Sequence, residues 1–196
     1  MKVSILEQSD DILKLLLEEA DYNSMNKIRR FLYTDYGVYA PTKILVHKND
    51  TNLSNPIVAL KLGLVPIKNF LILEDDYIRE YNQVDAPNEI KCTLNYTAIE
   101  DEEKLMSNYI ELLTKYNEKT GIFPCFEDIV LTELLKDQQI HVDIYYSKGV
   151  PSNHLKFRSC FISSTEELED DKFVVTIENY GIISTDEIYN AILEYV

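Results

Sequence analysis

Residues 26–66 read NKIRRFLYTDYGVYAPTKILVHKNDTNLSNPIVALKLGLVP. This stretch predicts, in order, the larger part of a helix, a strand over residues 43–47, a polar turn over residues 48–52, and a second helix that begins near residue 55. No catalytic motif elsewhere in the chain has an order and spacing as specific as these. The stretch therefore directs the interpretation towards assembly rather than chemistry.

The first helix is predicted over residues 21–36. Asp21 can accept a hydrogen bond from the free N–H groups of the first turn, and Gly37 is placed to end the helix in a left-handed turn. Arg29 borders the apolar stripe, so its stem can pack there while its guanidinium reaches a partner. The stripe itself consists of residues at or beside helical spacing: Met25, Ile28, Phe31 and Leu32.

The second helix is expected to be short and sharply bounded. Asn55 can cap its start, and Pro56 occupies the first helical position, where proline is favoured. Gly63 is placed to stop the helix, and Pro66 prevents it from continuing. The segment is therefore predicted to be a short helix that follows the polar turn.

Two other segments have helical character. Residues 11–20 are ambiguous on local grounds, because a Leu-rich run with Glu and Lys favours helix by propensity. Residues 100–119 are predicted as a helix from the spacing of three apolar or aromatic residues: Leu105, Tyr109 and Leu112.

Strands are expected in the remainder of the chain. Residues 129–135 and 140–146 are interpreted as a hairpin. A final helix begins near Ser184, which forms a capping box with Glu187 three residues later. Strands and helices mix without a regular β-α-β rhythm, so the fold class is predicted to be α+β.

The composition excludes several kinds of partner. The chain has 196 residues and a formal net charge of −15, and a field of this sign opposes binding to nucleic acid. A signal peptide and an apolar run near the roughly 20 residues of a membrane span are both missing, which predicts an intracellular protein without a membrane contact. The cysteines are scattered and predict free thiols rather than a zinc site: Cys92, Cys125 and Cys160.

Other candidate sites carry weaker signals. Residues 74–76 (Glu-Asp-Asp) could bind a hard cation, but an acidic surface loop is the favoured interpretation. Cys125 could form a nucleophile–base pair with His141 or His154, although nothing in the sequence brings these residues together. No nucleotide-binding motif is present in the sequence. The sequence therefore predicts no catalytic residue, no metal and no cofactor.

The segment from residue 26 to residue 66 resembles the signature of a polymerase family. This is the family of the third-largest (alpha-like) subunits of archaeal, eukaryotic and related viral multisubunit RNA polymerases. The final part, residues 59–66 (ALKLGLVP), is similar to the family's Ala-x-Arg-Leu-Gly-Leu-Ile-Pro. The earlier positions that match the family pattern are Asn26, Ile28, Arg29, Arg30, Ala40, Ile44, Asn49 and Asn55.

The resemblance implies two domains. Residues 1–44 and 160–196 would form an alpha-N-terminal-domain-like dimerisation domain of a sheet plus helices. This domain would be interrupted by a β-rich insert domain over residues 45–159. The resemblance also implies that residues 11–20 form the second strand of the dimerisation sheet, against their local propensity.

The resemblance further implies a non-catalytic, alpha-like scaffold subunit of a DNA-directed RNA polymerase, which is a nucleotidyltransferase as a complex. While the transcription complex assembles, it would heterodimerise with a smaller subunit of the same fold, dock on the second-largest subunit, and meet other small polymerase subunits. The predicted dimer interface is Met25, Ile28, Phe31, Leu32, Ile188, Ile192 and Tyr195. The predicted docking residues are Arg29, Arg30 and Lys61.

Two other hypotheses remain open from the sequence. The chain could be a free-standing α+β adaptor that binds proteins outside the polymerase, or a small thiol hydrolase that uses Cys125. As a polymerase subunit it would lie in the nucleus if cellular and eukaryotic, and in the cytoplasm or virion if archaeal or viral. The sequence leaves open which of these polymerases it serves.

Overall fold

The computed structural model describes residues 1–68, 89–113, 119–121 and 128–196. The chain divides into two compact units: residues 1–38 with 149–196, and residues 39–148. Both units are rich in sheet and carry few helices, so the predicted α+β class is confirmed. The unit bounds lie several residues before the predicted domain bounds, and the dimerisation and insert roles of those domains stay predictions.

The first unit is built on a four-stranded antiparallel sheet. Its strands, in spatial order, are β1 (Lys2–Gln8), β2 (Ile12–Glu18), β11 (Lys172–Asn179) and β10 (Cys160–Leu168). Strand β2 confirms the prediction taken from the resemblance over the one taken from propensity. Its buried leucines pair with apolar residues of β11 across the centre of the sheet, so tertiary contacts override the local helix preference: Leu13 with Ile177, Leu15 with Val175, and Leu17 with Phe173.

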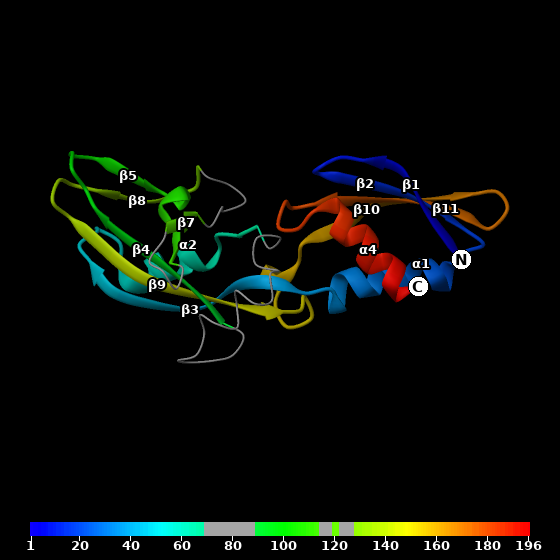
Figure 1. Ribbon diagram of the computed structural model, residues 1–196, viewed down its shortest axis with the longest axis horizontal. Helices are drawn as coiled ribbons and strands as arrows, with labels where there is room; N and C mark the ends of the chain where they lie inside the picture. The colour runs from blue at the N-terminus through cyan, green and yellow to red at the C-terminus, as the bar shows by residue number, and fades with distance from the viewer. Residues whose placement is uncertain (69–88, 114–118, 122–127) are drawn as a thin grey trace. The chain divides into compact units, whose positions relative to one another are not determined.

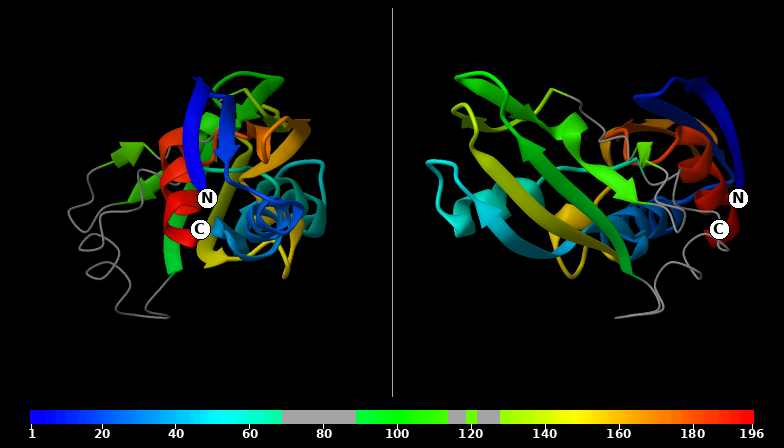
Figure 2. Two further views of the ribbon diagram at one scale, coloured as in Figure 1. Left: turned by 90° about the vertical axis from the view of Figure 1, so that its right-hand side faces the viewer. Right: turned by 60° about the vertical axis from the view of Figure 1, so that its left-hand side comes forward.

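Two helices from opposite ends of the chain cover one face of this sheet (Figures 1 and 2). They are α1 (Tyr22–Arg30) and α4 (Thr185–Tyr195). The Tyr22 ring meets the Phe173 ring of β11 edge-on at 5.2 Å, and the Tyr189 hydroxyl donates to the Val3 carbonyl of β1 at 3.3 Å. The two chain termini consequently lie near each other in every view.

The predicted helix starts are confirmed. The Asp21 side chain accepts a hydrogen bond from the Ser24 N–H at 2.7 Å at the start of α1. Ser184 and Glu187 form the complete capping box at the start of α4, with the Ser184 N–H donating to the Glu187 carboxylate at 2.7 Å. Both caps are local devices, so the sequence alone was sufficient to place them.

The expected role of Gly37 is wrong. The helix ends in a single π-helical turn, Phe31–Asp35, and Gly37 does not adopt the left-handed conformation. A Cβ atom at Gly37 would instead lie 2.0 Å from the Gly149 carbonyl oxygen. Gly37 is therefore needed because two backbone segments approach closely, rather than because of backbone handedness.

The second unit contains a five-stranded sheet and a separate two-stranded ladder. The sheet order is β3 (Val38–Asn49), β9 (Gln139–Gly149), β4 (Glu89–Thr97), β6 (Glu111–Leu113) and β7 (Lys119–Gly121), and the ladder joins β5 (Glu103–Met106) to β8 (Val130–Leu134). Helix α2 (Asn55–Gly63) contributes Val58 and Leu62 to the core of this unit.

Three predictions in this unit are corrected. Residues 100–119 do not form the predicted helix, because their described part contains β5, a short 3₁₀ turn and β6. Strands β8 and β9 do not form the predicted hairpin, since β8 pairs with β5 and β9 pairs with β4. Ser54 occupies the N-cap position of α2, without a side-chain capping hydrogen bond, and the Asn55 side chain accepts a hydrogen bond from Asn49 at 2.9 Å instead.

Candidate interaction surface

The helices α1 and α4 meet at a pair of aromatic rings. Phe31, directly after α1, stacks on Tyr195 at the end of α4 with ring centroids 4.3 Å apart and an interplanar angle of 12°. The two segments, which both contribute to the predicted dimer interface, thus lie side by side. We call this contact between Phe31 and Tyr195 the seam. The stacked pair is also accessible, because Tyr195 keeps 44% of its surface exposed.

Most of the predicted dimer interface lies inside the chain itself. Ile28, Leu32, Ile188 and Ile192 have at most 1% of their surface exposed and belong to the core beneath the sheet. A partner cannot contact them in this conformation, so as direct contacts they are corrected to core residues. The physical reason is that the four-stranded sheet is wide enough to cover the inner stripe of both helices.

A smaller apolar rim remains exposed around the seam. Met25 and Phe31 are half-buried, and Tyr195 is exposed. Leu193 and Val196 are exposed near the end of α4, on the helical face of Tyr189, which contacts β1. We call the exposed residues at this end of α4, Leu193, Tyr195 and Val196, the α4 rim. Neither sequence pattern nor resemblance had singled out Leu193 or Val196.

A second feature is a pair of half-buried arginines around one half-buried tyrosine ring. The Arg29 guanidinium lies 5.9 Å from the Tyr33 ring centroid, and its Nε donates to the Asn26 side chain at 3.2 Å. The guanidinium of Arg158 lies 4.6 Å from the same centroid. The Ile162 N–H donates to the Tyr33 hydroxyl at 3.2 Å, which fixes the ring between strand and helix. We call Arg29, Tyr33 and Arg158 the arginine cluster.

The charge of the arginine cluster is not neutralised within the described residues. Neither Arg29 nor Arg158 has a carboxylate oxygen within 4.0 Å there, although the chain carries a net charge of −15. The Nε of Arg158 is moreover buried without a hydrogen-bond partner. Buried polar groups of this kind are usually satisfied, so this nitrogen is an exception within the described part of the chain.

The other predicted docking residues differ from Arg29. Arg30 is exposed and makes no ion pair in the described part of the chain. The Lys61 ammonium donates to the Leu131 carbonyl of β8 at 2.9 Å, so it already connects α2 to the ladder of its own unit. The docking assignment of these residues stays a prediction, and Arg158 is an addition that no sequence pattern had indicated.

The candidate chemical sites differ in how far the structure describes them. Cys125 and residues 74–76 lie outside the described residues. The two described cysteines are free and buried, and burial raises the pKa of the Cys160 thiol to about 11, which disfavours the reactive thiolate. His154 accepts a hydrogen bond from the Lys156 N–H at 3.1 Å within a turn.

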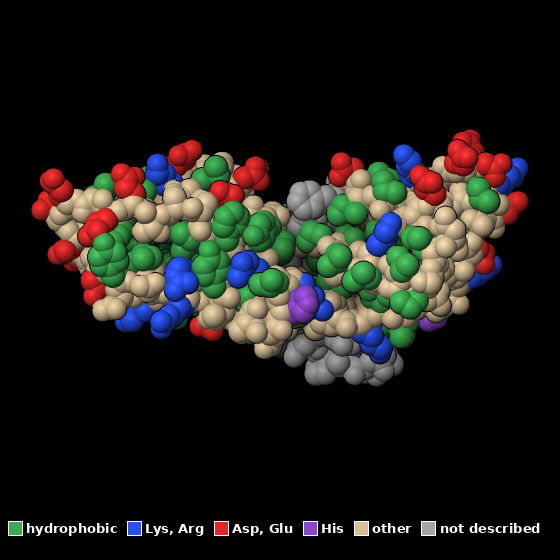
Figure 3. Space-filling view, turned by 180° about the vertical axis from the view of Figure 1, so that it is seen from behind, with side chains coloured by type: hydrophobic (Ala, Val, Ile, Leu, Met, Phe, Trp, Pro, Cys, Tyr) green, Lys and Arg blue, Asp and Glu red, His purple; other side chains and the backbone are tan. Residues whose placement is uncertain are grey.

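In each unit taken by itself, the side shown in Figure 3 carries hydrophobic side chains with basic ones among them, and acidic side chains mainly towards the edges of the unit. No helix within the described residues is long and apolar enough to cross a membrane.

The chain is an α+β protein in which both termini build one sheet-and-helix unit, and the middle of the chain forms a second, sheet-rich unit.

Comparisons with known proteins identify relatives of this chain by sequence. No family model matches the chain. It is 27% identical over 164 residues to the DNA-directed RNA polymerase subunit Rpo3 of Pyrobaculum arsenaticum, covering 83% of this chain and 61% of that protein. It is 22% identical over 170 residues to Rpo3 of Methanocaldococcus jannaschii, covering 87% of this chain and 77% of the relative.

A eukaryotic relative extends the similarity. The chain is 24% identical over 181 residues to the DNA-directed RNA polymerases I and III subunit RPAC1 of Mus musculus, covering 80% of this chain and 51% of that protein. The chain therefore spans about half to three quarters of the length of these curated relatives. The predicted resemblance to the alpha-like polymerase subunits is confirmed: the chain has homologues named Rpo3 and RPAC1 in archaea and eukaryotes.

Proposed function

We propose that this chain is a non-catalytic, alpha-like scaffold subunit of a DNA-directed RNA polymerase. The observation that carries the proposal is the contact between α1, which holds the arginine-bearing motif, and α4 from the other end of the chain, through Phe31 and Tyr195. The names of the relatives support the same reading. Nucleotidyl transfer would belong to the large subunits of the complex.

The first proposed partner is a smaller subunit of the same fold. The α4 rim, together with Met25 and Phe31, offers apolar surface at the edge of the helical layer. Obligate interfaces usually bury about 2,000 Å² or more in total and are apolar at their core. The partner would therefore cover the rim and extend over the outer faces of both helices.

The second proposed partner is the second-largest polymerase subunit. The arginine cluster suits it, because guanidinium groups bind carboxylates through two parallel hydrogen bonds and also donate to backbone carbonyls. Arg30, exposed beside the cluster in sequence, would extend the same contact. Direct contact with nucleic acid would be small, since the net charge of −15 repels phosphates.

Co-purification from the native host tests the proposal. The tagged full chain is expressed in its own host, purified under native conditions, and the co-purifying chains are identified by mass spectrometry. We expect a smaller alpha-like subunit and both large polymerase subunits in stoichiometric amounts. A stable, monodisperse monomer with none of these chains would overturn the proposal. Stoichiometric recovery of an unrelated partner alone would favour an adaptor outside the polymerase.

A further inference from the structure

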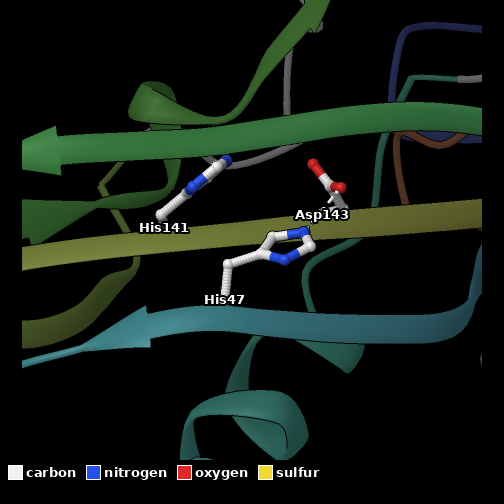
Figure 4. A group of neighbouring side chains, drawn as sticks. All are labelled: His47, His141 and Asp143. Carbon is white, nitrogen blue, oxygen red and sulfur yellow. Dashed lines mark hydrogen bonds and ion pairs between the residues drawn. The ribbon is translucent and has the colours of Figure 1, made fainter.

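A polar cluster interrupts the outer surface of the five-stranded sheet. It is formed by His47 from β3 and by His141 and Asp143 from β9 (Figure 4). His141 and Asp143 are two residues apart on one strand, so their side chains share a face of the sheet. The ligand atoms that the three residues offer all lie within 4.8 Å of one another.

The carboxylate of Asp143 is held in place by several donors. His47 Nε2 lies 2.8 Å from Asp143 Oδ2, and Thr93 donates to Asp143 Oδ1 at 2.9 Å. The Lys91 ammonium also lies 2.8 Å from Asp143 Oδ2. Only 8% of the Asp143 side chain is exposed, so these contacts fix the oxygen atoms that face the two imidazole rings.

The two histidine rings lie close together and are more accessible than the Asp143 carboxylate. Their ring centroids lie 4.8 Å apart at an interplanar angle of 40°. The His47 side chain is 43% exposed and His141 is half-buried, so both rings can adjust at the surface while Asp143 stays fixed. Preorganised oxygen and adjustable nitrogen donors on neighbouring strands are a suitable arrangement for capturing a small cation.

We propose that His47, His141 and Asp143 form a binding site for a divalent transition metal of the Zn²⁺ class. Two neutral imidazole nitrogens and one carboxylate oxygen are borderline ligands that suit this class, and water would complete the coordination. Metal–ligand bonds of about 2.0–2.2 Å in a tetrahedral site place the ligand atoms roughly 3.3 Å apart. The 2.8 Å separation of His47 and Asp143 must open slightly, and His141 must move inward.

The competing cation is Lys91. Its ammonium occupies the Asp143 oxygen that the metal would use, so binding requires it to move away. The Lys91 side chain is 39% exposed, so the displaced ammonium can move into solvent. Removing this positive charge should therefore strengthen metal binding, whereas a purely structural ion pair predicts no such gain.

Metal titration of the full chain, alone or with its co-purified partner, tests the site. Co²⁺ is followed by its visible absorbance and Zn²⁺ by competition with a chromophoric chelator, with circular dichroism confirming the fold. We expect one site per chain, and an affinity loss of at least about tenfold in both His47→Ala and His141→Ala. His154→Ala is the matched control, because His154 is the remaining histidine of the chain and lies outside the cluster.

Lys91→Gln supplies the second criterion. We expect it to raise the affinity by about tenfold or more without changing the one-to-one stoichiometry. The inference is overturned if folded protein binds neither metal, if the double variant His47→Ala/His141→Ala binds as well as the parent chain, or if His154→Ala abolishes binding. It is independent of the proposed polymerase role, so either can fail alone.

Discussion

Two adjacent residues of α4 allow folding and partner binding to be separated. Ile192 is completely buried beneath the sheet, whereas Leu193 keeps 43% of its surface exposed on the α4 rim. Ile192→Asp places an unpaired carboxylate in the core, at a cost of about 3–5 kcal/mol or more. Domains are stable by only about 5–15 kcal/mol, so we expect this variant to lose much of its stability.

Leu193→Asp should behave differently. Its carboxylate stays hydrated in the free chain, and its position near the end of α4 costs only about 0.3–1 kcal/mol against the helix dipole. If a partner covers the rim, the same carboxylate is desolvated on binding, at about 3–5 kcal/mol. Association should then weaken by roughly a hundredfold to several thousandfold, since 1.4 kcal/mol corresponds to tenfold.

Urea unfolding and titration calorimetry with the smaller subunit measure the two effects on the same preparations. Leu193→Lys is the matched control, because it removes the same apolar surface while a cation suits the end of a helix. It should fold like the parent chain and still bind poorly. The reasoning is refuted if Leu193→Asp binds the partner as tightly as the parent chain, or if Ile192→Asp unfolds at the parent's urea concentration.

Three further predictions follow from other residues. Arg29→Glu with Arg158→Glu should weaken recruitment of the second-largest subunit in co-purification by about tenfold or more and leave the smaller partner bound; loss of the smaller partner would show that the surfaces are misassigned. Gly37→Ala should lower the free energy of unfolding in urea by more than about 1 kcal/mol, because the added Cβ would lie 2.0 Å from a carbonyl oxygen. Gly63→Ala is the control and should change stability little, because its added Cβ would lie 3.7 Å from a side-chain atom. The Cys160 thiol, with its pKa raised to about 11 by burial, should resist alkylation at pH 8 in native protein and react after unfolding; rapid native labelling in peptide mapping would contradict this burial.

Local signals in the sequence predicted local structure well. Asp21 and Ser184 were identified as helix caps because a cap depends only on the next three residues. The segment at residues 11–20 required the family resemblance, since a strand at the centre of a sheet is decided by neighbours far away in sequence. The helix predicted over residues 100–119 failed for the same reason: Leu105 lies in β5 and pairs with Thr132 of β8.

The candidate sites depend even more strongly on contacts between residues that are distant in the sequence. An apolar stripe indicates that a helix face is covered, but not whether the chain or a partner covers it, which is why Ile28 and Ile188 were assigned to an interface and are core. The arginine cluster joins Arg29 to Arg158, and the cluster proposed for metal joins His47 to β9. No spacing rule can connect residues so far apart, because only the folded sheet order brings them together.

The α4 rim and the arginine cluster of the first unit would bind their partners through different forces, so the salt dependence of binding can distinguish the two surfaces. Apolar association at the α4 rim depends little on ionic strength, whereas carboxylates bound to the arginine cluster are screened as the Debye length falls from about 10 Å at 0.1 M to about 3 Å at 1 M. The chain's net charge of −15 adds a general repulsion towards acidic partners, so such a partner gains attraction only where Arg29 and Arg158 lie. Raising salt should therefore release the second-largest subunit from purified complexes before the smaller one, as measured by the chains that remain on an affinity resin. Release of the smaller subunit first, with the large subunit retained, would assign the arginine cluster to the heterodimer instead.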